Sequence, residues 1–225
     1  MKHNVDVKAH PLPLPLSHPL LPAFRLSKVD RSEFALRIPF PPPPSFRGLA
    51  AGPRSAFADR VSEEIFDVVN ERDEVIGTAP RSEVHRLDLR HRAVHVLIFN
   101  VRGELFLQQR SLAKDNWPGV WDSSSSGHLD SGEAYDACCL REVAEELGVH
   151  LSAVPPRLFK LEAGPDTGWE FCWVYRAEHE GPFHLQASEV RGGAWFPPDA
   201  VDEWLARRPD DFAGAFRVIW NQFRL

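Results

Sequence analysis

The pattern of hydrophobic and polar residues changes at about residue 60. From Glu64 onward, short runs of β-strand composition alternate with turn residues, and some stretches carry apolar residues at helical spacing. The expected strands are two hairpins, Ile65–Val69 with Val75–Gly77 and Ala93–Asn100 with Glu104–Gln109, and then Arg157–Ala163, Trp169–Arg176 and Gly193–Phe196. The expected helices are Ala134–Leu147 and a C-terminal pair, Asp199–Arg207 and Phe212–Phe223. Strands with helices on both faces predict an α/β sandwich.

Residues 1–60 show neither the two-residue period of a strand nor the 3.6-residue period of a helix, and they contain eleven of the 20 prolines, including the run Pro41–Pro44. Such a composition favours polyproline II or disorder. We therefore expect a disordered Pro-rich arm, followed by one domain of residues 61–225. The alternatives are a ligand for an SH3-like partner and a translation start downstream, for example at Val61.

The arm and the domain carry opposite charges. Residues 1–60 contain nine basic and four acidic residues, the remainder contains 17 basic and 28 acidic residues, and the whole chain has a net charge of −6. An acidic domain argues against nucleic-acid binding, which needs a basic face, and it suits a protein that holds divalent cations.

The cysteine content and the hydropathy of the chain indicate which cellular compartment to expect. Three cysteines, with Cys138 and Cys139 adjacent, give neither a disulfide framework nor Cys-x-x-Cys zinc spacing, which favours a reducing, cytoplasmic compartment. Prolines interrupt the apolar N-terminal stretch and argue against a signal-peptide helix. The absence of any run of 18 apolar residues argues against a membrane span.

The segment that carries chemistry begins at Gly127 and continues into the expected helix Ala134–Leu147. Glu142, Glu145 and Glu146 are spaced i, i+3 and i+4, which places three carboxylates on one helix face. Like charges at this spacing repel one another, and a divalent cation removes the repulsion. Oxygen ligands on a rigid helix, with room left for water and phosphate, are what Mg²⁺ prefers.

The same segment reads Gly127, five residues, Glu133, seven residues, Arg141-Glu142, an aliphatic residue, any residue, Glu145-Glu146, any residue, Gly148 and an aliphatic residue. This pattern is similar to the signature of the Nudix hydrolases, and the resemblance covers about residues 62–206. It implies a Nudix-type α/β/α sandwich with a mixed sheet. It also implies hydrolysis of a phosphoanhydride, with Mg²⁺ or Mn²⁺ neutralising the phosphates and activating the attacking water.

The resemblance also implies roles for individual residues. The expected metal ligands are Glu142, Glu145, Glu146 and the carbonyl of Gly127. Glu145 alternatively orients the attacking water, and Arg141 is expected to hold Glu133 and Glu145 in place. Outside the segment, Arg110 at a strand end is the candidate for contacting substrate phosphate, because a guanidinium offers bidentate hydrogen bonds; the alternative is an exposed strand-end cation.

Flanking residues resemble the isopentenyl-diphosphate isomerase branch of the same superfamily: Leu89–Ala93, Phe99-Asn100, Leu107–Ser111, Ala113-Lys114 and Trp117–Trp121. Those enzymes use a cysteine before a Gly-His pair, where this chain has the far less acidic Ser126. Their metal site uses two upstream histidines; His91 fits, whereas His85 is one residue out of register. Of two expected glutamates only Glu170 is present. The balance favours phosphoanhydride hydrolysis.

Several other residues are interpreted as structural. His91, His95 and His128 are expected to be satisfied polar groups, and Glu189 to be a surface acid. Trp117 and Trp121 are expected to pack, and the alternative is that they wall the leaving-group pocket.

We therefore expect a metal-dependent pyrophosphohydrolase acting on a nucleoside diphosphate or triphosphate, or on a related small-molecule diphosphate. The alternatives are an isomerase-like enzyme and a thiamine or prenyl diphosphate phosphohydrolase. A homodimer is compatible with the sequence; nucleic-acid and membrane partners are not expected.

Overall fold

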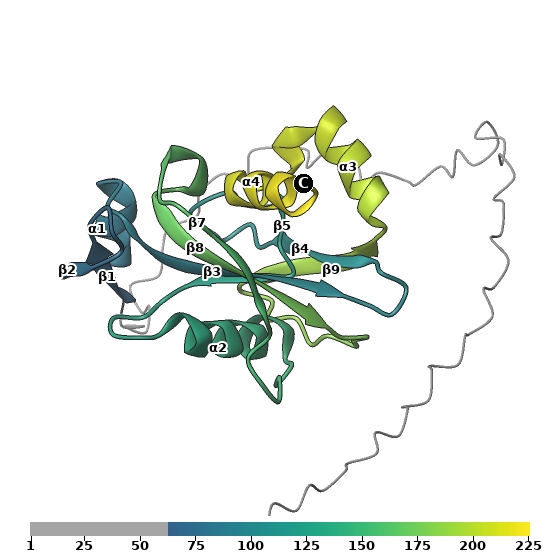
Figure 1. Ribbon diagram of the computed structural model, residues 1–225, viewed down its shortest axis with the longest axis horizontal. Helices are drawn as coiled ribbons and strands as arrows, with labels where there is room; N and C mark the ends of the chain where they lie inside the picture. Colours follow the sequence, from purple (N-terminus) through teal and green to yellow (C-terminus); the bar gives the residue numbers. More distant parts are fainter. Residues whose placement is uncertain (1–62) are drawn as a thin grey trace, which may run out of the picture. The chain divides into compact units, whose positions relative to one another are not determined.

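The computed structural model describes residues 63–225 (Figure 1). The expectations for residues 1–60, and the boundary at residue 61, lie outside this range. The strands are β1 (Ile65–Val69), β2 (Val75–Pro80), β3 (His91–Phe99), β4 (Leu105–Arg110), β5 (Trp121–Asp122), β6 (Ser125–His128), β7 (Arg157–Leu161), β8 (Glu170–Glu178) and β9 (Val190–Phe196). The α-helices are α1 (Arg81–Arg86), α2 (Tyr135–Leu147), α3 (Pro198–Arg207) and α4 (Gly214–Phe223).

One large mixed sheet forms the middle layer of the described residues. Strands β3 and β8 run parallel, and the other pairs of this sheet are antiparallel. Helix α2 covers one face, and α3 and α4 cover the other (Figure 1). The predicted α/β/α sandwich with a mixed sheet is confirmed.

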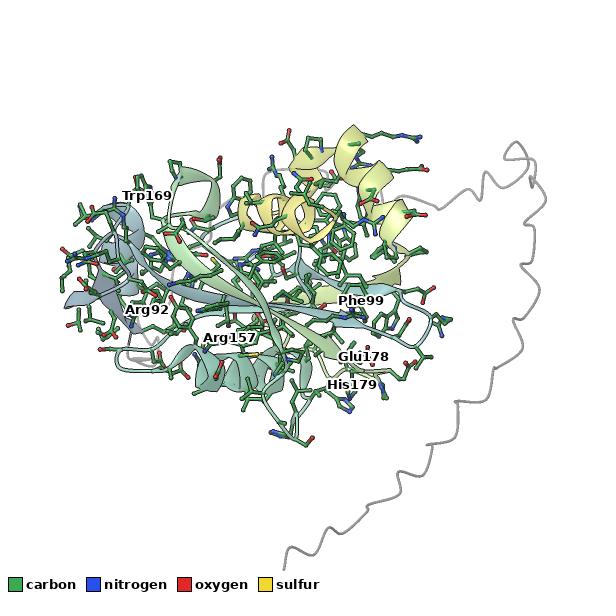
Figure 2. The ribbon with its side chains drawn as sticks, viewed as in Figure 1. Arg92, Phe99, Arg157, Trp169, Glu178 and His179 are labelled. Carbon is green, nitrogen blue, oxygen red and sulfur yellow. The ribbon has the colours of Figure 1, made fainter. Side chains whose placement is uncertain are left out.

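Strand β3 separates two hydrophobic cores because its side chains alternate between the faces of the sheet. Val94, Val96 and Ile98 pack in the core under α2, whereas Leu97 and Phe99 pack in the core under α3 and α4. Side chains fill both layers between sheet and helices (Figure 2). Each fully buried aliphatic side chain contributes about 1.5–3 kcal/mol, so an apolar central strand stabilises both layers at once.

The edge of β3 opposite β8 is shared by two strands. Strand β4 pairs with it only where Phe99 faces Leu105, and β6 pairs with its other end, from Ala93 to Val96. Where direct pairing stops, the Ser124 hydroxyl accepts a hydrogen bond from the Ile98 N–H (2.7 Å) and donates one to the Phe106 carbonyl. The sheet therefore opens between β4 and β6.

Three elements were not predicted from the sequence. Strands β5 and β6 border the run Ser123–Ser126, which has no apolar alternation, and their pairing depends on tertiary contacts. Helix α1 is too short to show a period. Helix α4 begins at Gly214 rather than at Phe212, because Phe212 is fully buried in the core before the helix starts.

Strands β1 and β2 and helix α1 form a small unit with its own core of Phe66, Ala79 and Val84. Asp73, in the β1–β2 turn, accepts hydrogen bonds from Arg92 (2.6 Å) and Tyr135 (2.9 Å) and pairs with Lys160. These contacts dock the unit against β3, α2 and β7. Between residues 63 and 225 no helix is long and apolar enough to span a lipid bilayer.

Candidate active site

Glu146 is the most firmly held of the three predicted carboxylates on α2. Its side chain reaches β6, and the residue is 2% exposed. Its Oε2 accepts hydrogen bonds from the Ser125 hydroxyl (2.8 Å), the Ser126 backbone N–H (2.9 Å) and the Gln108 amide (3.2 Å). Helix α2 is followed by Gly148, whose φ of +67° is the left-handed conformation common at helix ends.

Glu142 lies against the backbone of β6. A Cβ placed on Gly127 would lie 2.0 Å from Cδ of Glu142 and 2.1 and 2.3 Å from its carboxylate oxygens. Only glycine allows a carboxylate to approach the strand this closely. Gly127 and Glu142, two of the predicted ligands, are therefore direct neighbours.

Arg141 holds the acidic residues around it. Its Nε and Nη2 donate to the two oxygens of Glu133 (2.9 and 2.7 Å), and its Nη1 donates to Glu142 (2.7 Å) and Glu145 (3.0 Å). Its Nη2 also donates to the His128 carbonyl (2.9 Å). Bidentate pairing of this kind is geometrically specific, so the arginine fixes where these carboxylates lie. The contact to Glu142 was not foreseen.

The carboxylates of Glu142 and Glu146, at the sheet opening, lack enough nearby positive charge to keep both ionised. Burial, and then repulsion from Glu146, raise the pKa of Glu142 above its usual range; burial likewise raises the pKa of Glu146. Two buried carboxylates that resist ionising together are stabilised by a divalent cation. Glu145 lies at the rim and its side chain is 58% exposed. The ligand atoms that the three glutamates offer are all oxygens, which fits Mg²⁺ or Mn²⁺.

A second cluster contains His85, His91, His128 and Glu170. One nitrogen from each histidine lies within 4.8 Å of the others, and Glu170 Oε1 lies 3.0 Å from Nε2 of His128 and 3.7 Å from Nε2 of His91. The sequence register placed His85 out of reach. It comes within reach because α1 and the turn after it, where Asp88 has a left-handed φ of +53°, return the chain toward β3.

The histidines of this cluster share features with metal-binding histidines, in which one ring nitrogen is hydrogen-bonded and the other is free. Nδ1 of His91 lies 2.8 Å from the Leu89 carbonyl, which directs its Nε2 inward as the free nitrogen. The Nε2 atoms of His85 and His91 are buried without a hydrogen-bond partner among the described residues. Burial lowers the pKa of His128 to about 3, so this imidazole is neutral at pH 7. Neutral imidazoles with unpaired nitrogens can bind a cation.

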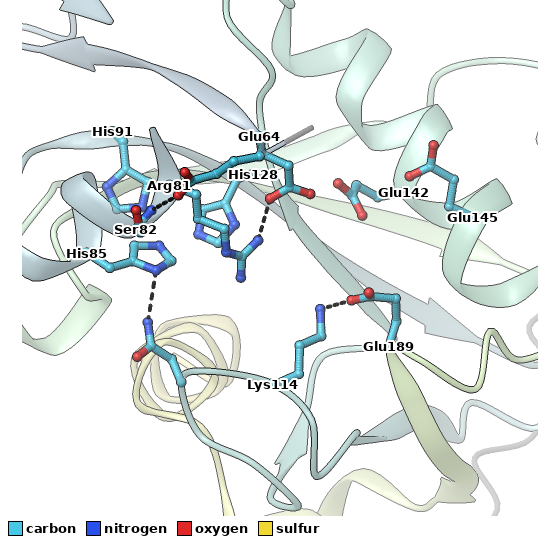
Figure 3. A network of polar contacts seen from close by, with 12 residues as sticks. Glu64, Arg81, Ser82, His85, His91, Lys114, His128, Glu142, Glu145 and Glu189 are labelled. Carbon is cyan, nitrogen blue, oxygen red and sulfur yellow. Dashed lines mark hydrogen bonds and ion pairs between the residues drawn. The ribbon is translucent and has the colours of Figure 1, made fainter. Parts of the chain in front are cut away.

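The three glutamates of α2 line a pocket of about 320 Å³, and His128 and Glu170 of the second cluster line it too. Figure 3 shows the histidines on one side, Glu142 and Glu145 on another, and the side chains of Arg81 and Lys114 pointing into the space between them. Arg81 pairs with Glu64 at 2.6 Å, and Lys114 pairs with Glu189. Both cations are at least three-quarters buried, whereas their acidic partners are 53% and 40% exposed.

Arg110 is held differently from Arg81 and Lys114. Its Nη1 donates to the buried Asp122 (2.9 Å), and its Nε and Nη2 donate to the Asn116 carbonyl (3.3 and 3.1 Å). All three donor nitrogens therefore have protein partners. The structure places this guanidinium at the pocket wall, supporting the loop that contains Lys114.

Sequence reasoning missed Arg81 and Lys114, and it compared His91, His85 and Glu170 with the isomerase metal site without grouping them with His128 as one cluster. The members of the cluster lie on α1, β3, β6 and β8, so no local spacing connects them. Lys114 is a single cation in a loop, and its position beside the carboxylates follows only from the packing. Glu189, interpreted as a surface acid, lines the pocket through its pair with Lys114.

Comparison with known proteins agrees with this geometry. Residues 89–216 match the NUDIX domain family. An uncharacterized Nudix hydrolase of Pseudomonas aeruginosa is 35% identical over 142 residues, covering 62% of this chain and 82% of the relative. An isopentenyl-diphosphate Δ-isomerase of Paenarthrobacter aurescens is 36% identical over 144 residues, covering 61% and 78%.

Two further similarities concern the whole fold. Nudix hydrolase 3 of Arabidopsis thaliana is 50% identical over 186 residues; the match covers 73% of this chain and 24% of the plant protein. A crystal structure of a Deinococcus radiodurans protein superposes with a TM-score of 0.63 at 29% identity, covering 71% of this chain and 98% of that one. The chain therefore belongs to the Nudix hydrolase family, whose members hydrolyse phosphoanhydride bonds.

Proposed function

We propose that this chain is a divalent-cation-dependent pyrophosphohydrolase of a small organic diphosphate or triphosphate. The observation that carries the proposal is the set of oxygens at the sheet opening. Glu146 is buried against β6, Glu142 is 12% exposed and lies against Gly127, and Glu145 lies at the rim. We propose these three carboxylates and the Gly127 carbonyl as ligands of Mg²⁺ or Mn²⁺.

A divalent cation held there supplies neutralisation of phosphate charge and polarisation of water. The chain supplies the geometry. Glu145 is exposed enough to accept a hydrogen bond from water, and Arg141 fixes its direction. Lys114 and Arg81 bind phosphate oxygens, which replace the exposed carboxylates of Glu189 and Glu64. In this proposal Arg110 positions the loop that contains Lys114.

The histidine cluster supports a second cation site with different chemistry. Three imidazoles and the carboxylate of Glu170 suit Zn²⁺, Mn²⁺ or Fe²⁺ better than Mg²⁺. Because His128 and Glu170 line the same pocket as the carboxylates, a cation at the second cluster would lie near the substrate that the carboxylates hold. This cluster also favours a second candidate function, diphosphate isomerisation of the kind named for the Paenarthrobacter relative. Ser126 opposes that function, since a hydroxyl is a far weaker acid than a thiol.

The test is a panel of diphosphates and triphosphates incubated with Mg²⁺ or Mn²⁺, with released phosphate and pyrophosphate measured separately. Glu145→Gln should lower the hydrolytic rate by about a hundredfold or more with an unchanged melting temperature. Glu203→Gln, at an exposed position of α3, is the matched control and should leave the rate unchanged. Hydrolysis in excess EDTA, or an unaffected Glu145→Gln variant, would refute the assignment. Double-bond migration in isopentenyl diphosphate without phosphate release would favour the isomerase.

Mg²⁺ as the working ion and a cytoplasmic location belong to the same proposal. The three cysteines are buried and free, which supports a reducing compartment. The homodimer stays a prediction.

A further inference from the structure

One wall of the pocket contains no basic residue. It is formed by the loop between β4 and β5, the turn Pro165–Thr167 and the beginning of α4. The residues of this wall are Trp117, Pro165, Asp166, Ala213 and Ala215. The wall contains one large aromatic ring, small apolar groups and one carboxylate, and none of these five residues is a cation.

Trp117 is the tryptophan that this wall exposes to the pocket. It is 48% exposed, whereas Trp121, Trp204 and Trp220 are between 1% and 9% exposed in the core under α3 and α4. From the sequence alone, Trp117 and Trp121 received the same interpretation. The structure separates them: Trp121 packs, and Trp117 lines the pocket.

The indole of Trp117 is held in place on its other side. A Cβ on Gly214 would lie 3.3 Å from its Cζ2, and the Arg217 guanidinium lies 5.3 Å from the ring centroid. Its backbone has a φ of +52°, which costs a bulky residue on the order of 1–3 kcal/mol. The preceding carbonyl, that of Asn116, is fixed by Arg110. A strained, exposed and immobilised aromatic ring is suited to binding rather than to packing.

Asp166 adds a polar group beside the ring. Its backbone carbonyl and Trp117 both lie next to Gly214, at 3.2 and 3.3 Å from a Cβ placed there. Asp166 is exposed and is one of the residues that line the pocket, and within residues 63–225 its carboxylate has no hydrogen-bond or ion-pair partner. An acceptor without a partner at the edge of an aromatic surface favours a flat group with a hydrogen-bond donor on its rim.

We propose that Trp117 and Asp166 form the subsite for the organic part of the substrate, and that this part is an aromatic ring with a hydrogen-bond-donating edge. An aliphatic chain would gain little there, since the apolar surface beyond the ring consists of proline and alanine side chains. This inference rests on the proposed hydrolase function for its diphosphate end. It goes beyond that function in naming the residues and chemistry that select the leaving group.

The test compares four diphosphates that share the reacting group: methyl diphosphate, isopentenyl diphosphate, 2-phenylethyl diphosphate and 2-(4-aminophenyl)ethyl diphosphate. Binding is measured by calorimetry, and turnover by phosphate release. The wild-type protein should bind the aminophenyl compound most tightly and the phenyl compound next. Trp117→Ala should raise KM about tenfold for both aromatic compounds and leave it unchanged for methyl diphosphate, because stacking alone is lost.

Matched variants separate the subsite from the fold. Trp117→Phe should restore most of the aromatic preference. Asp166→Asn should raise KM for the aminophenyl compound alone. Trp173→Phe replaces a tryptophan that also stacks on an arginine but lies under α2, and it should change none of these values.

Two results would overturn the subsite: equal affinity of the wild-type protein for isopentenyl and phenylethyl diphosphate, or an equal effect of Trp117→Ala on all four compounds. Should the aromatic preference appear in calorimetry while no compound is hydrolysed, the subsite stands and the hydrolase proposal fails. Hydrolysis of all four compounds with equal KM would support the hydrolase and overturn the subsite.

Discussion

Replacing Gly127 with alanine tests whether the close approach of Glu142 to β6 builds the cation site. The added Cβ would lie 2.0 Å from Cδ of Glu142, and reaching an ordinary contact of 3.4 Å requires a movement of about 1.4 Å. Ligand positions in metal sites are set to within about 0.2 Å, so the displaced carboxylate leaves the cation. A misplacement of about 1 Å at a reacting centre costs on the order of a hundredfold in rate.

We therefore expect Gly127→Ala to lower kcat/KM for diphosphate hydrolysis by about a hundredfold and to raise the Mg²⁺ concentration needed for half-maximal rate. The control is Gly192→Ala, since a Cβ on Gly192 meets nothing within 4 Å. Circular dichroism and thermal melting show whether each variant folds. If Gly127→Ala does not fold, Glu142→Gln removes the charge with almost no change in shape and should give the same loss of rate.

This account of the cation site is refuted if Gly127→Ala folds and hydrolyses its substrate at the wild-type rate and Mg²⁺ requirement. It is also refuted if the rate falls while the Mg²⁺ requirement stays unchanged in both variants. Either result would mean that Glu142 does not hold the cation from its place beside β6.

Three further predictions concern the pocket and its supports. Lys114→Ala should raise KM for the diphosphate more than about tenfold in steady-state kinetics, whereas Arg110→Lys should mainly lower the melting temperature in thermal melts. A larger effect on KM from Arg110→Lys than from Lys114→Ala would contradict the distinction between the two residues. His91→Gln should remove about one equivalent of bound Zn²⁺ or Mn²⁺ in elemental analysis of the purified protein, and unchanged metal content would exclude a histidine site. Asp73→Asn should cost about 2–3 kcal/mol at pH 7, because two cations lose a charged partner. Burial alone would raise the pKa of Asp73, but hydrogen bonds from Lys160, Arg92 and Tyr135 lower it. This contribution is therefore full above the unfolded pKa of about 4 and disappears as the pH falls through the folded value. The unfolding free energies of the wild type and variant, measured in urea, should converge as the pH falls below the lowered folded pKa of Asp73, and a constant difference would refute the ion-pair account.

The parts of the fold that were predicted from the sequence are those with local periodicity. The apolar run of β3 and the apolar stripe of α2 indicated the central strand and the helix correctly, since each element buries one or both faces along its own length. The order of strands, and the shared edge of β3, depend on which distant segments pair. The Ser-rich run at β6 has no apolar pattern and is ordered by contacts with Glu146 and β3.

The candidate site divides in the same way. The glutamates of α2 could be identified because one helix fixes their spacing, and the contact between Arg141 and Glu133 spans a single loop and helix. The histidines come from elements that meet only in the folded chain. Arg110 shows the limit of reasoning by residue type: its charge suggested phosphate binding, whereas its donors contact Asp122 and Asn116.

The small unit of β1, β2 and α1 has its own core, yet it supplies Arg81 to the pocket. The small unit therefore has to remain docked against the large sheet for this side of the pocket to exist; Phe66 of its core stacks on His128 of β6 with ring centroids 4.8 Å apart. Local opening of this unit at its Asp73 contacts would remove one side of the pocket while the large sheet stays folded. If the proposed enzyme works at this pocket, the stability of the docked small unit would limit its activity, and hydrogen exchange in β1 and β2 would measure how often this side of the pocket opens.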